Sequence, residues 1–273
     1  MKTLLAVGCS FTNPNYRSRE HPEMDCSWPK WPEIVGKRLG YNVVNLGKNG
    51  ASNDNIMRSA QDYMTTQKVD MVCALWTEPC RLNIHDAYHG NWYAYLKQDA
   101  ESIAGAKYRH AKQATKSLVD YNAIAQNLCR TDDHLLLASE MLRNMHTLDI
   151  IGKSYNVPVY HMQGVVLWKT HVYKTANKIS GDYMTESEIN KKFKSWLNAF
   201  IQSPYFDILD KQTNIWGWPF YEELGGELPF DAKMDNLAFD TNRISFNDTH
   251  PSAKGQQTLA DKYLELIEQN ATN

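Results

Sequence analysis

A serine near the start of the chain and an aspartate–histidine pair near its end have the residue types of a nucleophile and its activating base. Ser10 follows Gly8 and Cys9, while Asp248 and His250 lie two residues apart, nearly the whole chain away. A serine hydroxyl is a weak nucleophile until an adjacent base, itself held by a third group, takes its proton. Asp248 and His250 are the candidates for that holder and that base.

Taken singly, each of these residues also has an ordinary structural role. Ser10 suits a turn or a helix N-cap, Asp248 suits a turn, and His250 suits the start of a helix with its ring hydrogen-bonded. The three together, each in a loop beside a predicted strand or helix, favour the catalytic interpretation.

The apolar pattern predicts the strands that would position these residues. Residues 4–7 form a short apolar run that ends at Gly8, so Ser10 falls on the first strand-to-loop turn. The run at residues 69–76 is almost continuously apolar, as a central strand of a parallel sheet is. Further strands are predicted at residues 42–46 and 157–162, with a short one at Phe206–Leu209.

Predicted helices alternate with these strands. Ser52 or Asn53 suits the N-cap of a helix that runs to about Gln67. Thr185 and Glu188 have the spacing of a capping box. The other predicted helices cover residues 33–39, 112–156, 185–201 and 252–269. This alternation predicts one α/β domain over residues 1–273, with a parallel sheet covered by helices on both faces.

Three long segments interrupt this pattern. Residues 13–32 are rich in proline and form a predicted loop near Ser10. Residues 82–110 and 163–246 are interpreted as insertions, and residues 216–239 within the second as a lid over a pocket.

Composition excludes several classes of protein. The net charge is −2 and 42% of residues are hydrophobic, so the chain has no basic footprint for nucleic acid and enough apolar residues for a core. No signal peptide and no apolar run of membrane-spanning length occur. Five cysteines, an odd number, favour reduced thiols over a disulfide framework, which predicts a cytoplasmic protein. His85 and His89 are spaced for a metal on a helix, but a solvated loop is the favoured interpretation, and we expect no metal or cofactor.

The carboxyl ends of parallel strands bring loops to one edge of a sheet, where ligands bind. Ser10 lies after the first strand, Gly50 and Asn53 after the second, and Thr77 after the third. A tetrahedral intermediate needs donors aimed at its oxyanion, and the sources here are the Ser10 and Gly50 N–H groups with a side-chain amide. Asn53 has a helix cap as its alternative role, which its position favours.

These residues resemble the ordered sequence blocks of the SGNH/GDSL hydrolase superfamily. The matching stretches are Gly8-Cys9-Ser10-Phe11, Asn45-Leu46-Gly47-Lys48-Asn49-Gly50 and Asp248-Thr249-His250-Pro251. The resemblance implies a flavodoxin-like three-layer α/β/α fold and a serine esterase mechanism. It implies that Ser10 is the nucleophile, His250 the general base and later acid, and Asp248 the residue that orients His250. Ser10 and Gly50 would supply oxyanion-hole amides.

The chain departs from the family pattern at two places. Cys9 replaces the aspartate that usually follows the first glycine. After the third strand the family has Gly-x-Asn-Asp, whereas this chain has Trp76-Thr77-Glu78-Pro79 and so lacks the oxyanion asparagine. Either Asn53 or Thr77 replaces that asparagine, or the hole has only two donors.

The sequence therefore predicts an acyl or acetyl esterase that acts on an O-acylated carbohydrate or small metabolite. A catalytically silent ligand- or glycan-binding module with the same fold is one alternative, since the third block is altered. An acyltransferase that uses the same three residues is another.

Overall fold

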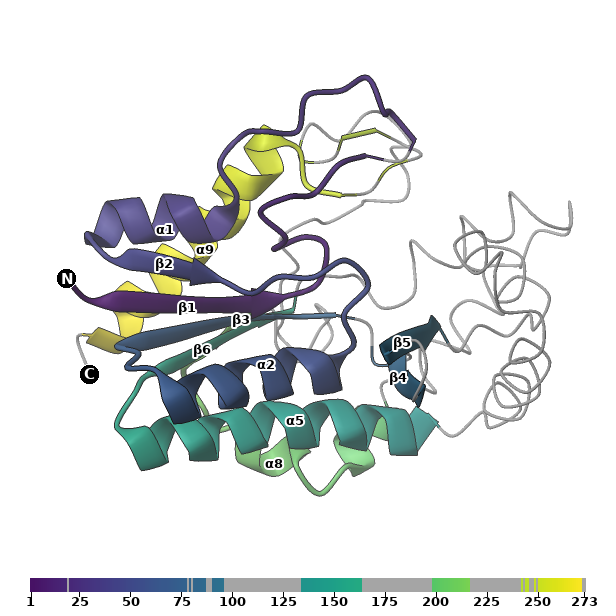
Figure 1. Cartoon of the computed structure of the whole chain (residues 1–273). Coiled ribbons are helices and arrows are strands. Elements are labelled where there is room, and N and C mark those ends of the chain that lie inside the picture. Colours follow the sequence, from purple (N-terminus) through teal and green to yellow (C-terminus); the bar gives the residue numbers. More distant parts are fainter. Residues whose placement is uncertain are drawn as a thin grey trace, which may run out of the picture.

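The computed structural model describes residues 1–18, 20–77, 79, 81–86, 90–95, 134–163, 198–216, 242, 244–245, 248 and 250–271. Among these residues, five parallel strands form the central sheet in the order β2-β1-β3-β6-β7 (Figure 1). Their bounds are β1 (Thr3–Gly8), β2 (Asn42–Asn45), β3 (Met71–Trp76), β6 (Val159–Gln163) and β7 (Ile215–Trp216). Counted within this sheet, the order is second, first, third, fourth and fifth, which is the flavodoxin-like order. The predicted fold class is confirmed.

Helices cover both faces of the sheet. On one face α1 (Trp31–Leu39) packs against α9 (Ala253–Ala271), and on the other α2 (Asn53–Thr66) packs against α5 (His134–Tyr155) and α5 against α8 (Phe206–Leu209) (Figure 1). Ser52 caps α2 by accepting a hydrogen bond from the Asn55 N–H, and Gly40 ends α1 in a left-handed conformation. The chain therefore forms three layers, helix, sheet and helix.

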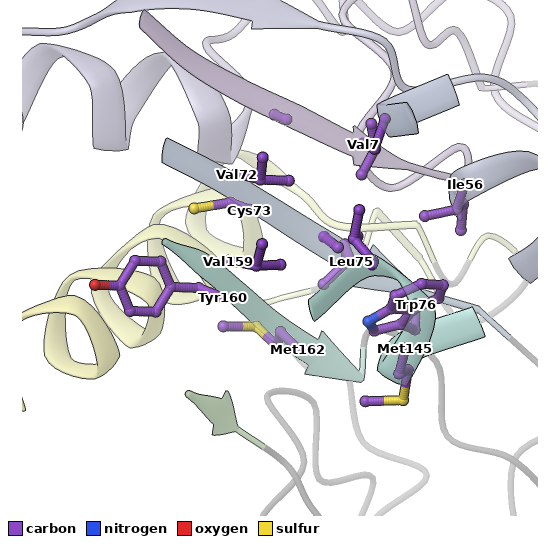
Figure 2. Packing of buried hydrophobic residues seen from close by; sticks show 14 of the residues in the cluster. Val7, Ile56, Val72, Cys73, Leu75, Trp76, Met145, Val159, Tyr160 and Met162 are labelled. Atoms are coloured by element: carbon purple, nitrogen blue, oxygen red, sulfur yellow. The ribbon is translucent and has the colours of Figure 1, made fainter. Parts of the chain in front are cut away.

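The core lies between these layers. The residues of β3 are buried along its whole length, as predicted for a central parallel strand. Figure 2 shows side chains of β3 and β6 packed together with Ile56 of α2 and Met145 of α5. On the opposite face Trp31 of α1 stacks on Tyr263 of α9, with ring centroids 4.3 Å apart. Both faces of the sheet are thus covered by packed aromatic or aliphatic side chains.

Around the last strand of the central sheet, one predicted strand was wrong and one strand was missed. Phe206–Leu209 forms the helical turn α8 and not a strand, because its backbone bonds locally: the Asp210 N–H donates to the Phe206 carbonyl. The next strand is instead β7, which joins the sheet beside β6. An apolar run of four residues does not distinguish a helical from an extended period, and only the pairing with β6 identifies the strand.

The segment after β3 leaves the central sheet. β4 (Arg81–Asp86) and β5 (Gly90–Tyr95) form a separate antiparallel hairpin beyond the carboxyl end of the strands (Figure 1). Residues 96–133, 164–197 and 217–241 lie outside the described residues, and with them most of the two predicted insertions, the lid and the capping box at Thr185. No helix in the described residues is long and apolar enough to cross a membrane.

Candidate active site

Ser10 lies two residues beyond the end of β1, on a turn closed by a hydrogen bond from the Thr12 N–H to the Cys9 carbonyl (3.0 Å). Two glycines let this turn pack tightly. A Cβ on Gly8 would lie 2.1 Å from the Thr12 hydroxyl oxygen, and a Cβ on Gly47 would lie 2.6 Å from the Thr12 carbonyl carbon. Any other residue at either position would push the serine turn out of place.

Helices on one face of the sheet hold the same turn. The Gln256 side chain in α9 donates to the Phe11 carbonyl (3.0 Å) and accepts from the Trp31 N–H (2.8 Å). The Trp31 indole N–H donates to the Thr12 hydroxyl (3.2 Å). One buried amide therefore connects the serine turn to both α1 and α9.

The structure brings Ser10, His250 and Asp248 together in one line of hydrogen bonds. His250 Nε2 lies 2.8 Å from the Ser10 hydroxyl oxygen, and His250 Nδ1 lies 2.6 Å from Asp248 Oδ1. A carboxylate accepts only, so Nδ1–H donates to Asp248, and in the neutral imidazole Nε2 is then the acceptor for the Ser10 hydroxyl proton. Ser10 is 8% exposed and the His250 side chain 27% exposed, so the pair is sheltered but reachable.

Backbone bonds shape the loop that carries the last two residues. The His250 N–H donates to Asp248 Oδ1 (3.0 Å), and the Asp248 N–H donates to the Ser245 hydroxyl (3.0 Å). The Ile244 N–H donates to the His250 carbonyl (2.9 Å). These bonds fold the loop so that the Asp248 carboxylate turns back toward His250. Two residues that are only two positions apart can therefore form a hydrogen bond between their side chains.

Two further residues touch this constellation that sequence reasoning missed. Tyr16 and Ser18 donate from their hydroxyls to Asp248 Oδ2, at 2.9 and 2.5 Å. The Tyr16 ring also stacks on the His250 imidazole, with centroids 4.1 Å apart. Both residues lie in the proline-rich loop 13–32, and a loop has no periodicity that would identify them; its closeness to Ser10 in the sequence was the one available signal.

Hydrogen bonding decides the charge of Asp248. Burial alone raises the pKa of this carboxyl, but hydrogen bonds from His250 and Ser18 outweigh burial and hold its pKa below the ordinary value. Burial and the adjacent Asp248 charge raise the pKa of Tyr16, so its hydroxyl stays a proton donor. Asp248 is therefore ionised over the whole pH range in which the protein would act.

Gly50 is the residue after the second strand that was predicted to supply an oxyanion-hole amide. Its φ is 71°, in the left-handed region that glycine adopts without strain. Within the part of the chain that the structure describes, neither the Ser10 N–H nor the Gly50 N–H donates a hydrogen bond. Both backbone donors are therefore available for an oxyanion.

Asn53 and Thr77 occupy a different arrangement from the one predicted for either. Asn53 is the first residue of α2 and not its cap. Its side chain accepts from the Thr77 N–H (2.9 Å) and donates to the Thr77 carbonyl (3.1 Å). Thr77 is buried, and its hydroxyl oxygen has no hydrogen-bond partner among the described residues. Asn53 thus fixes the Thr77 backbone, and the Thr77 hydroxyl remains unpaired.

The register of the sheet relates Thr77 to Ser10. Gly8 of β1 pairs with Leu75 of β3, and Ser10 and Thr77 each lie two residues further along. The two residues therefore leave neighbouring parallel strands at equivalent positions, where the strand order reverses and ligands bind. Glu78 lies outside the described residues.

The described residues contain no group of three or more His, Cys, Asp or Glu side chains that could hold a metal ion. Of the predicted His85 and His89 pair, His89 lies outside the described residues and the His85 side chain is not described. Cys9, Cys26 and Cys73 are free, buried thiols.

No protein-family model and no curated protein matches the chain. Solved structures do resemble it. A lipolytic protein of the G-D-S-L family from Desulfitobacterium hafniense DCB-2 is 11% identical, with a TM-score of 0.45 over 97% of this chain and 99% of that chain. A carbohydrate acetylesterase family member from Sinorhizobium meliloti is 12% identical, with a TM-score of 0.45 over 98% of both chains. A catalytic mutant of an acetylxylan esterase from Geobacillus stearothermophilus is 15% identical, with a TM-score of 0.39 over 97% of this chain and 94% of that one.

These structures share little sequence with the chain. Its fold class rests on its own strand order, and its possible chemistry rests on its own side chains.

Proposed function

We propose that the chain is a serine-dependent ester hydrolase in which Ser10 is the nucleophile, His250 the general base and Asp248 the carboxylate that orients His250. The observation that supports this is the line of hydrogen bonds from Ser10 through His250 to Asp248, at 2.8 and 2.6 Å. This is the order and the contact distance that activation of a serine requires.

In the proposed reaction Ser10 Oγ attacks the acyl carbon of the ester and its proton passes to His250 Nε2. The carbonyl oxygen becomes an oxyanion that accepts hydrogen bonds from the Ser10 and Gly50 N–H groups. The intermediate collapses, the ester C–O bond breaks, and the alcohol leaves with the proton from His250. Water then gives a proton to His250 Nε2 and attacks the acyl carbon on Ser10. The bond between that carbon and Ser10 Oγ breaks, Oγ takes the proton back from His250, and the acid leaves.

The third oxyanion donor is proposed to be Thr77. Its hydroxyl is buried and unpaired among the described residues, and an idle buried hydroxyl costs free energy. Asn53 would serve this donor indirectly, because two hydrogen bonds of its side chain hold the Thr77 backbone. The asparagine missing from the third block is then replaced by a threonine at the same strand end.

The substrate class follows the resemblance in the sequence, an O-acyl or O-acetyl ester of a carbohydrate or small metabolite. The catalytically silent binding module and the acyltransferase remain the rivals. Product analysis with a sugar acceptor present separates hydrolysis from transfer, since the acyl enzyme on Ser10 serves both.

The test uses p-nitrophenyl acetate hydrolysis and labelling by a fluorophosphonate probe. We expect Ser10→Ala and His250→Ala each to lower kcat by about 10⁶-fold, with the far-UV circular dichroism and the melting temperature kept. Ser154→Ala is the matched control, since Ser154 lies exposed on α5 and bonds only to its own helix. A wild-type protein that neither turns over the ester nor takes the label at Ser10 contradicts the proposal and selects the binding module.

A further inference from the structure

The carboxylate of Asp248 accepts more hydrogen bonds than orienting a histidine requires. Oδ1 accepts from the ring Nδ1–H and the backbone N–H of His250, at 2.6 and 3.0 Å. Oδ2 accepts from the hydroxyls of Tyr16 and Ser18, at 2.9 and 2.5 Å. The second pair comes from a loop about 230 residues away in the sequence.

We propose that Tyr16 and Ser18 are positioning residues of the catalytic histidine, acting through Asp248 and, for Tyr16, also through the ring of His250. This inference rests on the proposed function, because it assigns to the 13–32 loop a part in the same reaction.

Ser18 is placed to give its proton to Asp248. Its hydroxyl oxygen accepts from the His21 N–H (3.0 Å), so its single proton is free to point at Oδ2. Ser18 is buried. A buried, charge-assisted hydrogen bond fixes the rotation of the carboxylate, and this leaves Oδ1 facing His250.

Tyr16 acts on both members of the pair. Its hydroxyl bonds Asp248 while its ring stacks on the imidazole at 4.1 Å and 24° between the planes. Phe11 approaches the same imidazole edge to face, at 5.3 Å and 62°. An aromatic face attracts a cation, and His250 becomes a cation only after it has taken the Ser10 proton. The stack therefore stabilises a state that forms during the reaction and is absent from the resting enzyme.

A structural role for the same contacts is the competing interpretation. His21 and Ser245 also join the two loops, through a contact of 2.7 Å between His21 Nε2 and the Ser245 hydroxyl. If Tyr16 and Ser18 only tied the loops together, their loss would lower the melting temperature or raise KM. If they position His250, their loss lowers kcat and leaves KM nearly unchanged.

The experiment compares graded variants at each position. Ser18→Ala removes the hydroxyl and Ser18→Thr keeps it. Tyr16→Phe keeps the stacked ring without the hydroxyl, and Tyr16→Leu removes both. Ser154→Ala and Tyr155→Phe, at exposed sites of α5, are the controls.

With p-nitrophenyl acetate we expect Ser18→Ala and Tyr16→Phe each to lower kcat by about 10- to 100-fold, as loss of a hydrogen bond to a charged group does. Tyr16→Leu should lower kcat about fivefold further through loss of the stack. Ser18→Thr should restore most of kcat, and the controls should match wild type. A fall confined to the melting temperature, a rise of KM at constant kcat, or no rescue by Ser18→Thr overturns the inference.

A second readout does not depend on turnover. The proton between His250 Nδ1 and Asp248 gives a low-field proton NMR signal, which is assigned by its absence in His250→Ala. We expect this signal to shift in Ser18→Ala and Tyr16→Phe and to stay in place in both controls. If the wild-type protein were inactive, the proposed function would be contradicted. The NMR signal would still report on the geometry of the His250–Asp248 pair, so the two failures can be told apart. An unshifted signal in both variants ends the positioning inference even if the enzyme is active.

Discussion

The described residues contain two Asp–His pairs: Asp248–His250, whose imidazole is partly exposed, and Asp149–His161, which is fully buried. Asp248 holds His250 at 2.6 Å through Nδ1, and Asp149 of α5 holds His161 of β6 at 2.9 Å through Nε2. The remaining nitrogen of His250 faces the Ser10 hydroxyl. The remaining nitrogen of His161 accepts from the Trp76 indole N–H, at 2.9 Å.

The partner of that remaining nitrogen decides what each pair can do. A hydroxyl gives up its proton and becomes a nucleophile, whereas an indole N–H is a donor only and does not. Because the Trp76 indole N–H donates to Nδ1 of His161, Nε2 is the nitrogen whose proton is bonded to Asp149. His161 is also 0% exposed, so no substrate reaches it. An Asp–His pair alone is therefore no sign of catalysis.

The second pair ties together three elements of the core. Asp149 also accepts from the Asn214 amide (3.0 Å), just before β7, and Asn214 donates to the Val159 carbonyl (2.8 Å). Burial raises the pKa of Asp149. The electrostatic interaction and hydrogen bond with His161, together with the hydrogen bond from the Asn214 amide, outweigh burial and hold this pKa below its ordinary value. The pair thus connects α5 to β6 and, through Trp76, to β3.

The strongest test of the difference between the two pairs is to replace each aspartate in turn by asparagine. Asp248→Asn should lower kcat by about 10⁴-fold, the effect of losing the correct histidine tautomer in a serine triad. Asp149→Asn should leave kcat of the folded protein close to wild type, because His161 keeps a carbonyl acceptor. The measurement is kcat for p-nitrophenyl acetate at a temperature where both variants are folded. Equal losses from both changes would show that the pairs are coupled and not distinct.

Removing the two histidines should reverse the order of effects on stability. His161→Ala leaves the Trp76 N–H without its acceptor and removes one hydrogen-bond donor from the buried Asp149 carboxylate, so the free energy of unfolding should fall by about 3–5 kcal/mol. His250→Ala should change it by less than about 1 kcal/mol, since the ring is partly exposed. Urea unfolding followed by circular dichroism measures both. A larger loss for His250→Ala would contradict this division.

Thr77 links the two pairs, because it follows Trp76 and leaves β3 at the same edge of the sheet as Ser10 leaves β1. Thr77→Val removes, at constant shape, a buried hydroxyl that has no partner among the described residues, so stability should stay the same or rise. If the hydroxyl is an oxyanion donor, kcat should fall by about 10²-fold, while Thr77→Ser should stay near wild type. Unchanged kcat in Thr77→Val would leave the hole with its two backbone donors.

The smallest expected effect concerns acid. Asp248 and Asp149 have lowered pKa values in the folded protein. Below about pH 4 the unfolded chain binds a proton at each site that the folded chain does not, so each site lowers stability by up to about 1.4 kcal/mol per pH unit as the pH falls. Urea unfolding between pH 6 and 3 should show this slope, and Asp248→Asn and Asp149→Asn should each reduce it. An unchanged slope in either variant would show that its carboxyl has an ordinary pKa when folded.

Much of the fold could be predicted because its signals are local. The apolar runs at β1, β3 and β6, the Ser52 cap of α2 and the amphipathic pattern of α9 each lie within one short segment. Phe206–Leu209 and β7 were misjudged because two to four residues contain too little pattern to define a period. Their states depend on pairing with β6 and on bonds within the turn.

By itself, the sequence determined the order of the elements and the candidates Ser10, Asp248 and His250, whose residue types limit the possible chemistry. Only the tertiary structure decided which other residues contact these three. The contacts of Tyr16 and Ser18 with Asp248 span more than 200 positions, and so does the bond between Ser10 and His250. Likewise, Trp76 and not any local motif makes His161 a structural residue. Hydrogen bonds depend on distance in space, and distance between remote segments is set by how the layers pack.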